Sequence, residues 1–221
     1  MKIYHVDLIR EGGAKLPPDF STEGRAIGLG FFDGVHRGHQ ELLRTLVYEA
    51  KKAGLRPAVF SFDRYPKQVP PETSLVVAEA EPNDDQHKQP EHMLQSPLAP
   101  SFQTFHGLLQ AHSDRECIFA ELGIEELILQ ILEANLGAKL IVTGSDYRFG
   151  MNQGGNIEIL HAWAKERGIR AVTVDPVLMN NEIVSSSLIR EKVVEGAFDE
   201  VRALLGRGYT MKGVVIRGNA L

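Results

Sequence analysis

The stretch AIGLGFFDGVHRGHQELL, residues 26–43, predicts a strand, a turn and a helix in immediate succession. Its first seven residues are apolar with spaced glycines, which is typical of a buried strand, and the Asp-Gly pair that follows is a turn signal. From His39 onward apolar residues recur at helical spacing as far as Gly54. His36 and His39 therefore lie at the first turn of a helix that follows a strand. Free backbone N–H groups and the positive end of the helix dipole favour an anion there, and phosphate is the usual one.

Two common phosphate-binding loops do not fit this stretch. Gly28-x-Gly30 begins a dinucleotide fingerprint, but Asp33 stands where the third glycine belongs. A P-loop requires lysine and then Ser or Thr after its last glycine, whereas Gly38 is followed by His39 and Gln40. The remaining H-x-G-H pattern would contact phosphates through imidazoles. Two other interpretations stay open from these residues alone: two solvated histidines in a turn, and a metal pair, which the lack of a nearby third ligand disfavours.

The composition is that of an ordinary globular protein with no basic character. The chain has 221 residues, 43% hydrophobic and 24% charged, enough for one domain or one and a half. A net charge of −5 disfavours a nucleic-acid partner. The single cysteine, Cys117, excludes an internal disulfide and suits a reducing compartment. No signal peptide or membrane-spanning run is recognisable, so we expect a cytoplasmic protein that does not bind membranes.

The rest of the chain alternates between strand and helix patterns, which predicts an α/β fold with a doubly wound parallel sheet. Strands are expected at residues 2–6 (an edge strand), 56–62, 139–143 and 170–174, and residues 11–24 as a polar loop. Helices are expected at residues 113–122, 156–168 and 197–205, with Asn156 as a cap and Gly168 as a stop. Residues 124–129 could form a strand, although residues 125–138 also fit a helix.

Residues 66–113 differ in character from the rest of the chain. Seven of the eleven prolines and four of the eight histidines lie there, and helical or alternating periodicity is mostly lost. The segment is expected to be an irregular insertion. The spacing of its histidines fits no standard metal-binding motif, so no metal site is predicted.

Residues 31–43, FFDGVHRGHQELL, resemble the ATP-binding motif of the bacterial FAD synthetases. These form the adenylyltransferase module of bifunctional riboflavin kinase/FMN adenylyltransferase and belong to the HxGH nucleotidyltransferase superfamily, which has a Rossmann-like fold. Residues 60–69, FSFDRYPKQV, resemble the family's F-T/S-F-E-P-H-P stretch. Asp63 stands there for Glu and Tyr65 for His.

A second signature, VTGSDYRFG at residues 142–150, resembles the family's V-V-G-x-D-F-x-F-G. It follows a predicted parallel strand, and the carboxyl ends of such strands are where ligands bind. The resemblance implies that Gly144, Asp146, Phe149 and Gly150 help to hold the nucleotide, while Tyr147 replaces a phenylalanine. Taken alone, Asp146 also fits a turn-forming aspartate without a ligand.

A third signature, VSSSLIR at residues 184–190, resembles the superfamily's I/V-S-S-T-x-I-R. Serine hydroxyls and free N–H groups at a helix start, with Arg190 one turn in, are suited to phosphate, which arginine can bind bidentately. Ser187 replaces threonine, and Leu188 stands where flavin enzymes often have arginine. A serine N-cap beside a surface arginine is the alternative. Two anion-binding helix starts in the order that the superfamily uses favour the phosphate site.

The resemblance implies FMN adenylyltransferase activity, which transfers AMP from ATP to FMN and releases pyrophosphate. His36, His39 and Arg190 would act at the triphosphate, Mg²⁺ would bridge phosphate oxygens, and no residue is assigned as a metal ligand. Nucleotide contacts are assigned to groups from all three signatures: Gly28, Phe32, Asp33, Gly34, Gly38, Gly144, Asp146, Phe149, Gly150, Ser186 and Ser187.

The chain also departs from the family. The family's F-x-x-L-S-x-x-x-F-like stretch, which lines the flavin side, has no counterpart before residue 137, so ATP is better supported than FMN. Two alternatives follow: a degenerate nucleotide-binding or regulatory paralogue, and a nucleotidyltransferase for another phosphorylated acceptor. We expect a nucleotidyltransferase domain at residues 1–206 and the truncated start of a riboflavin kinase domain at 207–221. On this expectation the chain has no riboflavin kinase activity, and a separate riboflavin kinase chain is a candidate partner.

Overall fold

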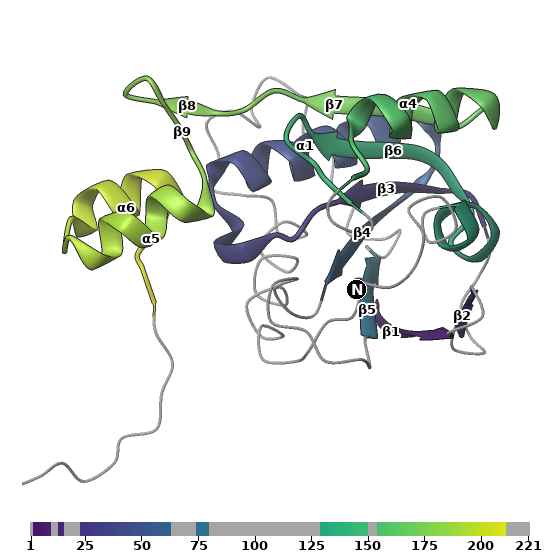
Figure 1. Ribbon diagram of the computed structural model, residues 1–221, viewed down its shortest axis with the longest axis horizontal. Coiled ribbons are helices and arrows are strands. Elements are labelled where there is room, and N and C mark those ends of the chain that lie inside the picture. The colour runs from purple at the N-terminus through teal and green to yellow at the C-terminus, as the bar shows by residue number, and fades with distance from the viewer. Residues whose placement is uncertain are drawn as a thin grey trace, which may run out of the picture.

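A computed structural model describes residues 2–9, 13–15, 23–62, 74–79, 129–149 and 154–210, and within these residues seven strands form one mixed sheet (Figure 1). Its four parallel strands lie in the order β4 (Arg56–Phe62), β3 (Arg25–Leu29), β6 (Ala138–Gly144) and β7 (Arg170–Val174). The predicted α/β fold and its parallel strands are confirmed. Strands β4, β6 and β7 lie within one residue of their expected bounds, whereas β3 ends at Leu29, three residues before the expected end at Phe32.

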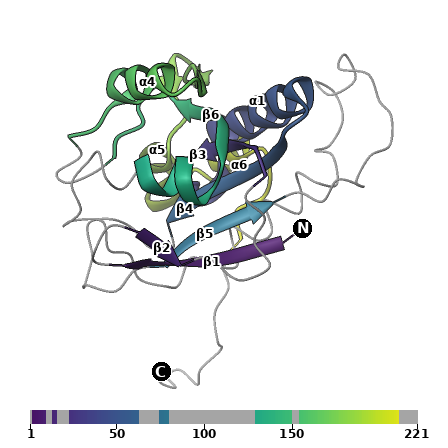
Figure 2. The same cartoon turned by 90° about the vertical axis from the view of Figure 1, so that its right-hand side faces the viewer.

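Three strands paired antiparallel extend the sheet beyond β4, and of these the sequence predicted only the one that contains residues 2–6. They are β5 (Ser74–Glu79), β1 (Lys2–Ile9) and β2 (Gly13–Lys15), and Figure 2 shows β1 and β2 on the side of the sheet away from β6. Residues 2–6 were predicted as an edge strand, and among the described residues they pair with β5 alone, while β2 pairs only with the end of β1, at Asp7, Leu8 and Ile9. A three-residue strand is too short to show a period in the sequence, so residues 13–15 were expected as loop.

The irregular insertion expected at residues 66–113 is likewise wrong at residues 74–79. There the run SLVVAE forms β5 between β4 and β1. Its β-branched residues carry the strand signal that the surrounding prolines obscured. The other residues of that segment, and the helix expected at 113–122, lie outside the described residues.

Helices cover both faces of the parallel strands, as the doubly wound arrangement requires. Helix α1 (Arg37–Ala53) packs Leu42, Leu43 and Leu46 against alternate residues of β3, β4 and β6. On the opposite face, α4 (Ile157–Glu166) and the π-helix η3 (Leu129–Asn135) pack against the remaining set. Of the segment that fitted either a strand or a helix, residues 129–135 are helical and Ala138 begins β6.

Gly28 lets α1 approach β3 closely. A Cβ at this position would lie 3.0 Å from a terminal carbon of Leu46 and 3.3 Å from one of Leu42. Part of the requirement for glycine here is therefore the packing of the helix on the strand.

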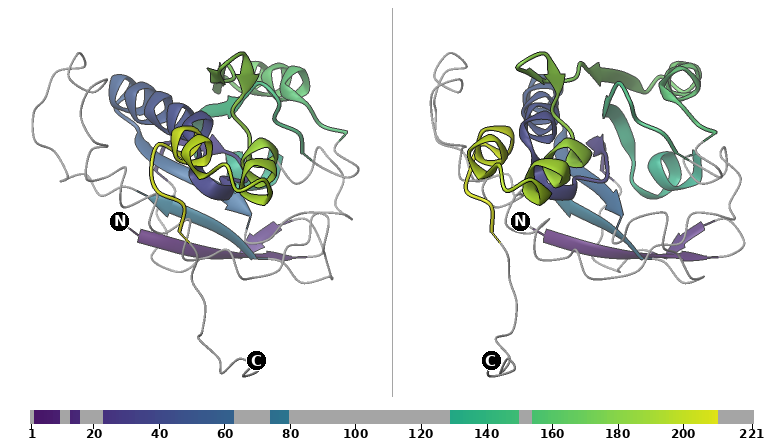
Figure 3. Two further views of the ribbon diagram at one scale, coloured as in Figure 1. Left: turned by 90° about the vertical axis from the view of Figure 1, so that its left-hand side faces the viewer. Right: turned by 60° about the vertical axis from the view of Figure 1, so that its left-hand side comes forward.

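The last two helices of the described residues lie outside the sheet. They are α5 (Ser186–Val194) and α6 (Phe198–Leu205), and they share a small hydrophobic core of their own. A hairpin of β8 (Leu178–Met179) and β9 (Glu182–Ile183) precedes them. Its two-residue loop, Asn180-Asn181, has φ values of 52° and 66°, as a type I′ turn requires. Figure 3 shows α5 and α6 side by side next to the start of α1.

We predict that Gly155→Ala lowers the free energy of unfolding by about 1–3 kcal/mol, because overpacking displaces a buried ring. Phe149 and Gly155 exchange backbone hydrogen bonds, and a Cβ on Gly155 would lie 2.3 Å from two carbons of the Phe149 ring. Urea denaturation of the purified protein measures the change. Gly208→Ala is the control, because its Cβ would meet nothing within 4 Å. Equal midpoints for the two variants would contradict the packing argument.

Candidate active site

The loop between β3 and α1 is a tight 3₁₀ turn, η1 (Asp33–Val35), with unusual backbone angles. Phe32, Gly34 and Val35 have φ values of 50°, 68° and 36°. Glycine adopts this region freely, but a non-glycine residue there costs on the order of 1–3 kcal/mol. The turn therefore persists because its surroundings hold it, and it sets where α1 begins.

The H-x-G-H motif forms the first turn of α1. His36 is the N-cap, and its Nδ1 accepts a hydrogen bond from the backbone N–H of His39 at 3.4 Å. The two imidazoles stack with centroids 3.8 Å apart and planes 19° apart. A Cβ on Gly38 would lie 3.1 Å and 3.2 Å from two atoms of the His36 ring, so glycine at this position leaves room for that ring to fold back over the helix start.

Burial keeps both histidines neutral at physiological pH. Desolvation lowers the pKa of His36 to about 4, against a smaller rise from the nearby Asp146 carboxylate. Desolvation also lowers the pKa of His39 well below its usual value, and the charge of His36 adds to that effect. Because Nδ1 of His36 accepts a hydrogen bond, the proton of its neutral ring lies on Nε2. Nδ1 of His39 is buried and has no hydrogen-bond partner among the described residues.

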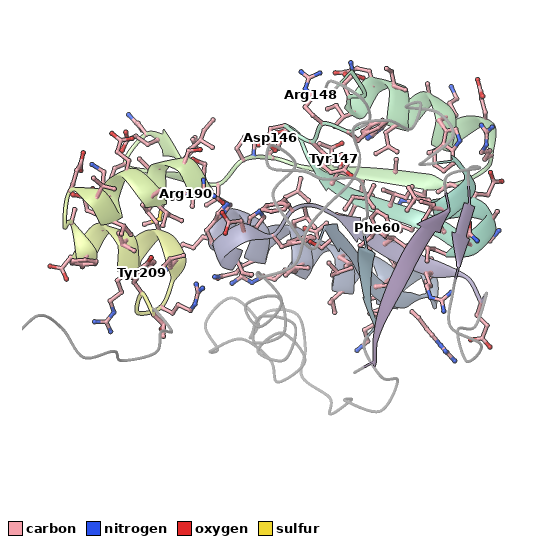
Figure 4. All side chains as sticks on the ribbon, turned by 60° about the horizontal axis from the view of Figure 1, so that its bottom comes forward. Phe60, Asp146, Tyr147, Arg148, Arg190 and Tyr209 are labelled. Carbon is pink, nitrogen blue, oxygen red and sulfur yellow. The ribbon has the colours of Figure 1, made fainter. Side chains whose placement is uncertain are left out.

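The third signature lies against this loop, although more than 150 residues separate the two in sequence. Ser185 caps α5 by accepting a hydrogen bond from Leu188 N at 3.2 Å. Ser186 Oγ donates to the Asp33 carbonyl at 3.0 Å, and the Arg190 guanidinium forms an ion pair with the Asp33 carboxylate. Figure 4 shows Arg190 where α5 meets the start of α1. The expected proximity of the two helix starts is thus present, through Asp33, while the Ser187 side chain is exposed.

The second signature follows β6 and reaches the same site through Asp146. A Cβ on Gly144 would lie 3.0 Å from Asp146 Oδ1, so this glycine leaves room for the carboxylate. Asp146 is exposed, yet close enough to raise the pKa of His36. Tyr147, labelled beside it in Figure 4, packs into the core, where burial raises its pKa. Phe149 is buried beneath Gly155, and Gly150 lies outside the described residues.

Three polar residues that the sequence did not single out hold this loop to the end of α6. Gln40 Nε2 donates to the carbonyls of Val35 at 3.0 Å and Leu205 at 2.8 Å. Arg37 Nε donates to the Ala203 carbonyl at 2.7 Å, and Arg207 Nη2 to the Gly34 carbonyl at 3.0 Å. Gln40 could have been noticed as a polar residue three positions before Leu43, on the apolar face of the helix. The two arginines carry no such signal.

Within the described residues, no group of three His, Cys, Asp or Glu side chains is arranged to hold a metal ion. A search of the same residues for a helix long and apolar enough to cross a membrane also finds none.

The fold and the site together define a class of protein. Parallel strands with helices on both faces, and an H-x-G-H helix start beside a second serine- and arginine-bearing helix start, are the arrangement of a Rossmann-like nucleotidyltransferase. The family model for FAD synthetase matches residues 19–93 and 106–188, which make up most of the chain. The chain belongs to the FAD synthetase family.

Curated relatives named bifunctional riboflavin kinase/FMN adenylyltransferase align over nearly the whole chain. The protein from Listeria monocytogenes is 31% identical over 202 residues, covering 91% of this chain and 60% of the relative. The Buchnera aphidicola protein (strain Sg) is 28% identical over 197 residues, covering 89% and 59%. The Escherichia coli K12 protein is 26% identical over 199 residues, covering 90% and 59%. The chain thus spans about three fifths of the length of these relatives.

A solved structure from Streptococcus pneumoniae, described as a macrolide-efflux protein, is also similar. It superposes with a TM-score of 0.60 at 26% identity, and the match covers 85% of this chain and 58% of that one.

We predict that the neutral histidines make stability depend on pH between about 5 and 6.5. Their folded pKa values lie below the unfolded value of 6.5, so the unfolded state binds more protons as the pH falls through this window. The free energy of unfolding should therefore fall by up to about 1.4 kcal/mol per pH unit for each histidine. Urea denaturation at several pH values measures the slope. A His36→Asn/His39→Asn variant keeps all other histidines and should lose most of it; an unchanged slope would rule out this origin.

Proposed function

We propose that this chain is an FMN adenylyltransferase, which transfers AMP from ATP to FMN and releases pyrophosphate. The observation that carries the proposal is that two helix starts lie together at one residue. Asp33, just before the His36–His39 turn of α1, accepts a hydrogen bond from Ser186 and forms an ion pair with Arg190, both of α5. A triphosphate spans several ångströms and carries charge along its length, so two anion-binding groups side by side suit it better than one. The names of the curated relatives supply FMN as the acceptor.

The proposed reaction needs no protein nucleophile. An oxygen of the FMN phosphate attacks the α-phosphorus of ATP, and a new P–O bond forms. The bond from the α-phosphorus to the bridging oxygen breaks, and its electron pair leaves with pyrophosphate. Catalysis then consists of holding the reacting groups in line and stabilising the charge that develops on the phosphoryl oxygens.

We assign that stabilisation to His36 and His39. Both rings are neutral, so each offers one N–H donor in a partly buried site. His36 Nε2–H and the free backbone N–H groups of the first turn would donate to oxygens of the α- and β-phosphates. Donors in a region of low dielectric stabilise developing charge more than donors in water.

Arg190 would hold the departing β- and γ-phosphates with Ser186 and Ser187. Its present partner is the Asp33 carboxylate, and both side chains are partly exposed, so the pair contributes at most about 1 kcal/mol. Phosphate oxygens, which carry more charge and allow bidentate contact, can therefore replace Asp33 as the partner of Arg190. In this proposal Ser186 keeps its bond to the Asp33 carbonyl, which uses its one hydroxyl proton, and offers phosphate its backbone N–H.

The remaining predicted contacts belong to the adenosine and acceptor sides. We assign Gly28, Phe32, Asp33, Gly34 and Gly38, at and before the start of α1, to the adenosine side. We assign Gly144, Asp146, Phe149 and Gly150 of the second signature to holding the nucleotide, as the family resemblance implies. The ring centroids of Phe32 and His39 lie 5.3 Å apart, which supports a role of Phe32 in fixing the His39 ring.

Mg²⁺ is proposed as a partner of the triphosphate. Since the described residues offer no three-ligand cluster, the ion would arrive with ATP, bound mainly by phosphate oxygens and water. It would neutralise charge on the leaving pyrophosphate. We further propose a cytoplasmic location, where ATP is abundant, and a riboflavin kinase, in this or another chain, as the source of FMN. The division of the chain near residue 206 stays a prediction.

We predict that the purified protein, given ATP, Mg²⁺ and FMN, forms FAD and pyrophosphate in equal amounts. His39→Ala should lower kcat by about 100-fold or more, because one preorganised donor to the transition state is lost. Chromatography of the flavins and a coupled pyrophosphate assay measure both products. His161→Ala is the matched control, since this histidine lies on α4 and bonds to Thr173 Oγ1 instead.

The assay also separates the alternatives. Pyrophosphate release only with another phosphorylated acceptor would replace FMN as the substrate. ATP binding without turnover on any acceptor would indicate a nucleotide-binding paralogue. Full FAD synthesis by His39→Ala would overturn the assignment of the histidines.

A further inference from the structure

Three consecutive carbonyl groups of η1 are each held by a side chain from another part of the chain. The Asp33 carbonyl accepts from Ser186 Oγ, the Gly34 carbonyl from Arg207 Nη2 and the Val35 carbonyl from Gln40 Nε2, each at 3.0 Å. This is the segment whose positive φ values make it intrinsically unfavourable. Its conformation, which sets the direction of His36, therefore depends on these three donors.

Arg207 is the least expected of the three. It follows the last described helix, where the sequence predicts the boundary with a second domain. Its guanidinium is half-buried, which lowers its pKa, and Nη1 lies 3.5 Å from the Leu205 carbonyl. No ion pair of Arg207 occurs within the part of the chain that the structure describes. Burial removes water from a guanidinium, and hydrogen bonds to carbonyl groups must replace that water. Such bonds require the carbonyl groups to be held in defined positions.

The contacts of Arg207 exceed what a helix cap would require. Gly206, with φ of 72°, ends α6 and donates its own N–H to the Arg202 carbonyl, so the helix has a cap without Arg207. The bond to Gly34 spans 173 residues and joins the end of α6 to η1. Gln40 makes a second link between the same two segments, through Val35 and Leu205. The α5–α6 pair, which carries Ser186 and Arg190, is thereby fixed to the loop that carries His36.

We propose that Arg207 is a positioning residue of the nucleotide site. It holds the Gly34 carbonyl, keeps η1 in the conformation that stacks His36 on His39, and fixes α6, and through it α5, against that loop. The inference rests on the proposed function only in assuming that the site binds a nucleoside triphosphate. It follows that the nucleotidyltransferase module requires residues beyond 206, and that a chain cut at the predicted boundary loses affinity for ATP.

The test compares Arg207→Ala with Arg202→Ala in the full chain. Arg202 is an exposed residue of α6 with the same side chain, so its variant controls for the loss of a positive charge near the helix end. We expect Arg207→Ala to weaken ATP binding by about tenfold, as the loss of a charged hydrogen-bond donor implies. The Kd for Mg·ATP from isothermal titration calorimetry gives this directly, without turnover. Arg202→Ala should bind within twofold of the unchanged protein.

Two further readouts distinguish positioning from general stability. Millimolar guanidinium should restore most of the ATP affinity of Arg207→Ala and none in Arg202→Ala. The imidazole ¹⁵N spectrum of His36 should shift from a single Nε2–H tautomer toward a mixture, since its Nδ1 contact depends on the loop. If Arg207→Ala does not fold, Arg207→Lys keeps the charge but bonds one carbonyl only, and should show the same changes at smaller amplitude.

The proposal is overturned if Arg207→Ala binds ATP within twofold of the unchanged protein, or if it loses thermal stability while the Kd and the His36 tautomer are preserved. Failure of the proposed function looks different. In that case the unchanged protein binds ATP but forms no FAD, and the Arg207 comparison is still decided by the Kd values.

Discussion

The contacts of Asp33 hold the site together. Its carbonyl accepts from Ser186 and its carboxylate pairs with Arg190, so one residue of the β3–α1 loop receives both phosphate-type groups of α5. The two contacts differ in strength and in purpose. The partly exposed ion pair is weak, whereas the carbonyl bond lies in a half-buried contact and, once broken, leaves polar groups without partners. On the proposed function, nucleotide binding would thus redirect Arg190 to phosphate while the frame around η1 stays in place.

Burial of the two histidines determines what they can do. A charged imidazole or a lysine would bind a triphosphate tightly in every state of the reaction, which lowers KM without raising kcat. Neutral rings stacked 3.8 Å apart, with Gly38 leaving room for the overlap, offer directional donors with no full charge. Such donors stabilise the additional charge of the transition state selectively, provided that the ring positions are fixed. This requirement explains why many contacts hold the loop that precedes the two histidines.

The sequence could predict what depends on local periodicity. The strand before η1, the helix to Gly54, strands β6 and β7 and the Asn156 cap follow from spacing and turn chemistry, and the structure has them. It could not predict contacts made across the chain. Phe32 and Val35 adopt positive φ although neither residue favours it, because Gln40, Ser186 and Arg207 hold the neighbouring carbonyls. Strand β2 and the Asn180-Asn181 turn were missed because two or three residues show no period.

The net charge around the loop before any nucleotide binds is small. Arg37, Arg190 and Arg207 carry three positive charges, Asp33 and Asp146 two negative ones, and both histidines are neutral. A site with one net positive charge exerts only modest long-range attraction on a triphosphate, so on the proposed function most of its affinity would come from contacts made after docking. The backbone N–H groups at the start of α1 supply these without a mobile side chain, and they are aligned by η1. On the proposed function, alignment of the loop, more than the sum of nearby charges, would therefore determine how well phosphate binds here.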